Sequence, residues 1–328
     1  MSNIFKILLL FCISVFSLMF FAYNVEPYKL IVNSSNLFIP NWDKNLNGLK
    51  IGIISDLHIG TKNVDLEKLK LIVEQINNQN LDVIFLLGDF DAKLISSSKI
   101  PISEISKSLN KLNSKYGTFA ILGNHDYEPS GIIKPILKKA EIRLLEDESV
   151  YINHNKTKIK ICGTKDWWHY NIDVNKVLNS ISEPTILLSH NPDIFPEVPQ
   201  KVSLTLCGHT HGGEVSFPIL GSPFVPSIYS NKYSKGHIVE NNKHMFVTSG
   251  IGTLSRFRLY NPPEVVVLNL YSQNKTLESK NKFGKGLIDI LVKFKKKKYK
   301  KLCSVWLRKA DFAVAKPAFL VFKITIIT

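Results

Sequence analysis

The chain of 328 residues contains only four cysteines: Cys12, Cys162, Cys207 and Cys303. They are widely separated and form no CxxC pair, which argues against both a disulfide framework and a zinc site built from thiolates. No internal repeat is apparent. With 45% hydrophobic and 21% charged residues, the composition is that of a globular protein, and it excludes wholesale disorder, collagen and coiled coil.

Excess positive charge is nearly absent from most of the chain. The formal net charge is +15, but residues 275–328 hold 15 Lys and Arg against 3 Asp and Glu, so +12 lies there and +3 in the first 274 residues. A segment with so many positive charges is usually a solvated surface. Because aromatic and apolar residues accompany the cations, we expect residues 273–328 to associate with an anionic membrane surface. Nucleic acid is not an expected partner, since the rest of the chain is nearly neutral.

Charge is also scarce near the N-terminus, where Lys6 is the only charged residue in 4–23. About 20 apolar residues are enough to span a bilayer as a helix. A cleavable signal peptide is the alternative, although residues 20–23 (FFAY) show no clear small-x-small cleavage site. We therefore expect residues 1–24 to form a hydrophobic membrane anchor or signal-anchor.

Between these ends, the apolar pattern alternates between strands and helices. The first half predicts β-α-β-α-β, which implies a parallel sheet with flanking helices. Its strands are expected at 50–55, 82–87 and 118–122, and its helices at 66–76 and 102–112. Further strands are predicted at 158–162, 185–188, 202–207, 244–248 and 264–270. We expect one α/β domain over residues 25–272.

Polar clusters follow five of the predicted strands: DLH (56–58), GD (88–89), GNHD (123–126), His190 and GHTHGG (208–213). In open α/β sheets, ligands bind beyond the carboxyl ends of the strands. We therefore expect these clusters to converge on one pocket. A single DxH or GD is a weak signal, whereas GNHD arises by chance in such a chain on the order of once in 1,000.

The side-chain types in these clusters suit a metal site. On an extended segment, Asp56 and His58 point to the same side and can share one metal. The GHTH run repeats this spacing. Asp89 has two oxygens and can bridge two cations, and Asn124 offers a neutral carbonyl oxygen. Oxygen and nitrogen ligands without thiolate suit Mn, Fe, Zn or Mg in a two-metal site.

The motifs DLHIG, GDF, GNHDY, SHNPD and GHTHGG resemble the calcineurin-like metallophosphoesterase family over about residues 50–270. GIGT (250–253) and PPE (262–264) are similar to a subgroup of membrane-linked bacterial phosphodiesterases, which includes a UDP-2,3-diacylglucosamine pyrophosphatase. Two positions depart from the subgroup pattern. Asp91 directly follows Phe90, and Glu214 stands where Gln is usual. Neither is a predicted ligand.

The resemblance implies a four-layer αββα sandwich, with two mixed sheets between helices. It also implies two divalent ions, with Mn expected and Fe, Zn or Mg as alternatives. The first ion would be held by Asp56, His58 and His211, the second by Asn124, His190 and His209, and Asp89 would bridge them. His125 would protonate the leaving oxygen or stabilise the phosphoryl group, with Asp126 orienting its ring.

Three further residues are candidate substrate contacts. Arg258 could bind phosphate oxygens, because a guanidinium group binds them bidentately. Trp167 and Trp168 could form a lipid-facing wall, since Trp favours the membrane interface. Core packing is the alternative for both tryptophans, and an ordinary surface position is the alternative for the arginine.

These features predict a hydrolase that cleaves a phosphodiester or pyrophosphate bond in a membrane lipid precursor. The specific expectation is cleavage of UDP-2,3-diacylglucosamine to a lipid monophosphate and UMP, a step of lipid A synthesis. An envelope phosphodiesterase or nuclease and an inactive membrane-tethered binding module are the alternatives. The charges that flank residues 4–23 mildly favour a domain outside the cytoplasm. The basic tail and a nucleotide-linked substrate favour the cytoplasmic face of the inner membrane, which we expect.

Overall fold

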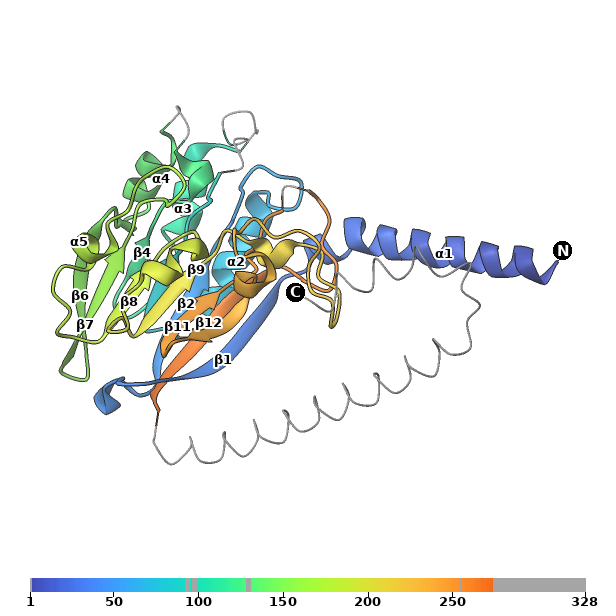
Figure 1. Cartoon of the computed structure of the whole chain (residues 1–328). Coiled ribbons are helices and arrows are strands. Elements are labelled where there is room, and N and C mark those ends of the chain that lie inside the picture. The colour runs from blue at the N-terminus through green and yellow to red at the C-terminus, as the bar shows by residue number, and fades with distance from the viewer. Residues whose placement is uncertain (1, 92–94, 96–99, 128–130, 254, 274–328) are drawn as a thin grey trace, which may run out of the picture. The chain divides into compact units, whose positions relative to one another are not determined.

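The computed structural model describes residues 2–91, 95, 100–127, 131–253 and 255–273. The predicted membrane-associating tail lies outside the described residues from residue 274 onward. Two six-stranded sheets form the centre of the domain (Figure 1). The order in the first sheet is β1 (Ile31–Ile39), β12 (Glu264–Ser272), β2 (Leu49–Ile54), β3 (Val83–Leu86), β4 (Thr118–Ala120) and β5 (Arg143–Leu144). The order in the second is β10 (Gly236–Glu240), β11 (Lys243–Val247), β9 (Leu204–Cys207), β8 (Thr185–Leu188), β7 (Thr157–Gly163) and β6 (Glu148–His154).

Both sheets are mixed. In the first, β2, β3, β4 and β5 are parallel, while β12 runs antiparallel to β2. In the second, β7, β8, β9 and β11 are parallel, and β6 and β10 are antiparallel at the two edges. Parallel neighbours end at the same edge of a sheet. The loops that follow β2, β3, β4, β8 and β9 therefore emerge at the same edge of their sheets. These loops carry the five polar clusters of the sequence.

Helices cover the outer face of each sheet. On the first sheet lie α2 (Leu66–Asn77), α3 (Ile102–Leu109) and α4 (Ile133–Lys139), and on the second lies α5 (Val174–Leu178). In α2, the side chain of Asp65 accepts a hydrogen bond from the Lys68 amide and caps the helix, which buries Leu69, Ile72 and Ile76 on one face. A third apolar core lies between the sheets. These four layers confirm the predicted αββα sandwich.

An apolar helix precedes the domain. Helix α1 (Asn3–Asn24) has 22 residues, a length of about 33 Å. Most of its large apolar side chains are exposed, and Ala22 is its only buried residue. It is the one described helix that is long and apolar enough to cross a membrane. Its end is attached to the domain, because the Arg258 amide donates to the Ala22 carbonyl at 2.9 Å and the rings of Tyr23 and Phe257 lie 5.1 Å apart.

Candidate metal centre

The five polar clusters meet at one edge of the sandwich. Asp56 and His58 follow β2, Asp89 follows β3, and Asn124 lies in a turn after β4. From the second sheet, His190 follows β8, while His209 and His211 follow β9. The structure thus brings together all seven side chains that were predicted as metal ligands.

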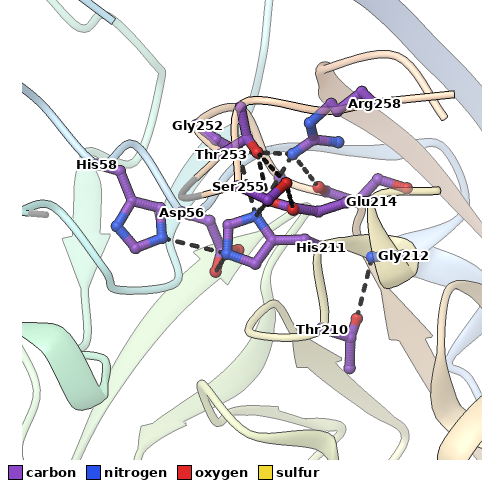
Figure 2. A network of polar contacts seen from close by, with 12 residues as sticks. Asp56, His58, Thr210, His211, Gly212, Glu214, Gly252, Thr253, Ser255 and Arg258 are labelled. Atoms are coloured by element: carbon purple, nitrogen blue, oxygen red, sulfur yellow. Dashed lines mark hydrogen bonds and ion pairs between the residues drawn. The ribbon is translucent and has the colours of Figure 1, made fainter. Parts of the chain in front are cut away.

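The first group of potential ligands consists of Asp56, His58, Asp89 and His211, all buried, with ligand atoms within 4.8 Å of one another. The Nε2 atoms of His58 and His211 are 3.1 Å apart (Figure 2). Asp89 Oδ2 lies 3.6 Å from His58 Nε2, and Asp56 Oδ1 lies 3.5 Å from His211 Nε2. Two carboxylates and two imidazoles therefore face one small volume.

The second group consists of Asp89, His190 and His209. His190 Nε2 lies 3.3 Å from Asp89 Oδ2. Asn124 joins this group, because its Oδ1 is 2.9 Å from His209 Nδ1. Since Asp89 belongs to both groups, one carboxylate can serve two neighbouring cations.

Hydrogen bonds fix the orientation of two of the imidazoles. The Nδ1 atom of His190 lies 2.7 Å from the Leu87 carbonyl, and that of His211 lies 3.1 Å from the Gly252 carbonyl. A carbonyl can only accept, so each Nδ1 donates, and each Nε2 faces the centre. His209 Nε2 is buried and has no hydrogen-bond partner among the described residues. Metal-binding histidines are typically oriented in this way, so these residues fit a divalent cation.

Burial and opposite charges set the protonation of the centre. Burial lowers the pKa of His58 well below its ordinary value, and burial together with nearby His190 lowers the pKa of His209 to about 3. For Asp89, burial raises the pKa, but the attraction of His190 and His58 outweighs it and holds the pKa well below the ordinary value. Burial opposes the charging of His190, yet Asp89 raises its pKa to about 10. The buried Asp89 carboxylate thus stabilises positive charge at the centre. A bound cation can supply that positive charge.

The backbone at the centre differs from the expected extended DxH segment. Five of the potential ligands have left-handed φ angles between 44° and 68°: Asp56, His58, Asp89, His209 and His211. Such conformations cost roughly 1–3 kcal/mol each and are typical of functional sites. Close packing accompanies them, since a Cβ at Gly208 would collide with Ser55 Oγ. Asp56 and His58 still reach one centre, but from a left-handed backbone rather than by strand alternation.

The predicted catalytic pair is only partly brought together. His125 is half-buried beside the centre, where its ring lies edge-on to His58 at 5.2 Å and its amide donates to Asp89 Oδ1 at 2.9 Å. The prediction that Asp126 orients this ring is wrong. The Asp126 carboxylate instead accepts hydrogen bonds from four backbone amides at 2.8–3.2 Å: Asp89, Phe90, Asp91 and Gly123. Burial and the Asp89 charge raise the pKa of Asp126 to about 8.

Arg258 is not placed to contact a phosphate. It is fully buried, and its guanidinium donates to three backbone carbonyls at 2.7–3.2 Å: Gly252, Ser249 and Asn261. Burial lowers its pKa. The Gly252 carbonyl also accepts from His211, so the predicted phosphate contact is replaced by a structural support behind a potential ligand (Figure 2).

The two tryptophans, predicted either to contact substrate or to pack in the core, have different surroundings. Trp168 is 50% exposed, and its ring meets His209 edge-on at 4.3 Å. Trp167 packs against the core on the outer face of the second sheet, and its Nε1 lies 3.4 Å from Glu197 Oε1. Only Trp168 therefore borders the centre.

Two polar arrangements near the centre were not predicted. The buried Asp166 accepts from His169 Nδ1 at 2.7 Å, and His169 is exposed beside Tyr127. Glu214 accepts from the hydroxyls of Thr253 and Ser255, and its carboxylate lies 3.9 Å from His211 Nδ1 (Figure 2). For the first arrangement, the available signal in the sequence was an acid, Asp166, three residues before a histidine. For the second, it was Glu214 in place of the usual Gln.

Comparison with known proteins agrees with this geometry. The family model for calcineurin-like phosphoesterases matches residues 49–213, half of the chain, from β2 to the last of the clustered histidines. The chain belongs to this family. It is therefore a metallophosphoesterase, an enzyme of phosphoric ester hydrolysis.

Relatives within the family include both characterised and uncharacterised proteins. Phosphodiesterase YaeI of Escherichia coli (strain K12) is 31% identical over 69% of this chain and 83% of its own. The uncharacterized metallophosphoesterase YkuE of Bacillus subtilis (strain 168) is 29% identical, covering 77% and 90%. UDP-2,3-diacylglucosamine pyrophosphatase LpxG of Chlamydia muridarum (strain MoPn / Nigg) is 26% identical, covering 75% and 91%.

Proposed function

We propose that this metallophosphoesterase uses two divalent ions to hydrolyse a phosphodiester or pyrophosphate bond in a membrane lipid precursor. The observation that carries the proposal is the pair of buried ligand groups that share Asp89. One ion would be held by Asp56, His58, Asp89 and His211, and the other by Asp89, Asn124, His190 and His209. The mixed oxygen and nitrogen ligands suit Mn, which we favour, with Fe, Zn and Mg as alternatives.

Bound divalent ions at such a site lower the pKa of water and neutralise charge on phosphoryl oxygens. The chain contributes the remaining chemistry. His125 stands beside the shared Asp89 with its ring half-buried, and we assign it proton donation to the leaving oxygen. Asp126 acts indirectly, because it ties the loops that carry Asp89 and Asn124 to each other.

Trp168 and His169 are suited to contact the groups that flank the reacting phosphorus. The exposed indole of Trp168 borders His209. His169 is exposed as well, and the buried Asp166 holds its ring in one orientation. An aromatic surface beside an oriented imidazole can receive a nucleotide or a sugar phosphate.

The membrane part of the proposal is supported by α1 and by the similarity to LpxG. We propose residues 1–24 as the anchor, 25–272 as the catalytic domain and 273–328 as a tail that binds an anionic leaflet. The substrate we favour is UDP-2,3-diacylglucosamine, which would yield UMP and the lipid monophosphate at the cytoplasmic face of the inner membrane. A tethered enzyme meets such a substrate at a raised effective concentration.

The test uses the full chain, purified in detergent and supplied with Mn²⁺. UDP-2,3-diacylglucosamine and bis-p-nitrophenyl phosphate are offered separately, and the lipid products are separated by thin-layer chromatography. We expect UMP and the lipid monophosphate from the first substrate. If the lipid stays intact while the diester is cleaved, the lipid substrate is wrong and a general phosphodiesterase, as the name of YaeI describes that relative, takes its place. If neither is cleaved with any of the four metals, the hydrolase proposal itself fails.

A further inference from the structure

Directly after the metal-binding histidines, the chain forms a loop whose apolar side chains face solvent. We call residues 217–228 the apolar loop. Ile219 is 105% exposed, Leu220 80%, Phe224 74% and Ile228 70%. Residues 215–231 contain no charged side chain and no histidine. Single exposed apolar residues are common, but a group of large ones on one loop marks a contact surface.

The fold holds these side chains in the exposed position. Phe217 and Gly221 exchange two backbone hydrogen bonds at 2.9 Å, which closes a tight hairpin around Ile219 and Leu220. Asn231 bonds both the amide and the carbonyl of Ser222 at 2.8 Å. The Ser222 hydroxyl in turn donates to the Gly212 carbonyl at 3.0 Å, next to His211. The polar atoms of the loop are thus bonded at its base, while its apolar tips have no cover among the described residues.

A short series of contacts joins this loop to the end of α1. The amide of Ser216, just before the loop, donates to the Leu259 carbonyl at 2.9 Å. The amide of the neighbouring Arg258 donates to the Ala22 carbonyl in α1. The exposed side chains therefore arise beside the point where the apolar helix meets the domain. Groups suited to a lipid headgroup region lie at the same point, since Lys29 Nζ is 4.7 Å from the Phe21 ring centre and Arg256 Nη1 is 3.4 Å from the Tyr23 hydroxyl.

We infer that the apolar loop inserts into the leaflet next to α1, and that it holds the metal centre at the level of the lipid headgroups. The inference rests on the proposed membrane attachment through α1. A bilayer suits the loop better than a protein partner for two reasons. The loop has no charge to pair with a partner, and it adjoins the helix that we propose as the membrane anchor. Because the loop leads directly from His211, its insertion would also orient the active site toward a substrate in the membrane.

Depth-dependent fluorescence quenching tests the insertion in the full chain. Cys12 and Cys303 are changed to serine, while Cys162 and Cys207 are buried and unreactive in the folded domain. One variant carries I219C, and a control carries V239C, at a position 55% exposed on β10. Both are labelled with an environment-sensitive dye and reconstituted into vesicles of phosphatidylcholine and phosphatidylglycerol that contain doxyl-labelled lipid. We expect strong quenching at position 219 and little at position 239.

Equal quenching at the two positions, or none at position 219, would overturn the inference. Poor labelling of I219C before reconstitution would also overturn it, because a second copy or another protein would then cover the loop. These readouts need no substrate, so they separate the inference from the proposed reaction. Failure at this step leaves the hydrolysis of a diester or a lipid precursor untouched.

A substrate comparison then links insertion to activity. The double variant I219N/L220N should lose about tenfold or more in turnover of a lipid substrate in vesicles, because the active site is no longer held at the surface. Its turnover of soluble bis-p-nitrophenyl phosphate should stay at the level of the wild type, and V239N should behave as the wild type with both substrates. An equal loss on both substrates would show that the loop serves the metal centre alone, which contradicts the inference.

Discussion

His58 Nε2 and His211 Nε2 lie 3.1 Å apart, although 153 positions separate the two residues in the chain. His58 follows a strand of one sheet and His211 a strand of the other. An imidazole Nε2 whose Nδ1 donates a hydrogen bond carries a lone pair, as His211 does here. With the carboxylates of Asp56 and Asp89 at 3.5–3.6 Å, the gap between the rings suits a cation.

Removal of metal should therefore affect both activity and stability. Chelation and dialysis should abolish diester hydrolysis and lower Tm, and added Mn²⁺ should restore both. An ion that binds only the folded chain, present at 100 times its Kd, stabilises it by about 2.7 kcal/mol. Differential scanning calorimetry at a fixed protein concentration measures the shift. An unchanged Tm together with retained turnover would show that no metal is required.

The His125→Ala variant should retain its metals and lose turnover. His125 is not part of either buried ligand group, and we assign it proton transfer. General acid catalysis contributes about 10²- to 10⁴-fold, so kcat should fall by about this factor. Metal content by mass spectrometry and kcat for the diester are measured on the same preparation. A metal-free variant would show that His125 is a ligand.

The Asp126→Ala variant should be strongly destabilised. Four backbone amides donate to this buried carboxylate, and each buried donor that loses its partner costs about 1–3 kcal/mol. We expect a loss of at least about 3 kcal/mol in the free energy of unfolding, measured with urea. Asp173→Ala is a matched control, because Asp173 caps α5 through one amide and its loss should cost only about 0.5–2 kcal/mol. Equal effects in the two variants would contradict the role given to Asp126.

Arg258→Lys should weaken metal binding more than substrate binding. A lysine keeps the charge but cannot donate to three carbonyls in the same geometry, so Gly252 and the His211 ring behind it should shift. We expect a 10- to 100-fold loss in metal affinity, about the effect of losing a partner that orients a ligand. KM for the diester at saturating metal should change little. A raised KM with unchanged metal affinity would instead support the direct phosphate contact that the sequence suggested.

The positions of the potential ligands were predictable because strand ends are fixed by apolar runs. DVIFLL and TFAIL marked β3 and β4, and parallel pairing necessarily brings the loops behind them to one edge. The conformation of those loops was not predictable in the same way. The left-handed φ angles at Asp56 and His58 depend on tertiary contacts, such as the amide of Asp56 donating to the Gly88 carbonyl.

Features that depend on distant partners were missed. Strand β1 reads IVNSSNLFI, with only Leu37 and Ile39 buried, and its pairing with β12 joins residues more than 230 positions apart. The roles of Asp126 and Arg258 were misassigned for a similar reason. Asp126 binds backbone amides, and Arg258 binds backbone carbonyls. A sequence does not show whether a charged side chain binds the backbone or a substrate. A catalytic carboxylate and a structural one, or a phosphate-binding arginine and a buried one, have the same residue type.

The metal content of Asp89→Ala tests the two-metal centre most directly. The wild-type chain, purified and equilibrated with Mn²⁺, should contain two ions per chain by mass spectrometry. Because Asp89 belongs to both ligand groups, its removal should reduce the content to less than one ion and abolish diester hydrolysis. Glu67→Ala, on the exposed surface of α2, should match the wild type. If Asp89→Ala retained two ions, or if the wild type bound only one and was fully active, the account of a shared carboxylate between two metals would be wrong.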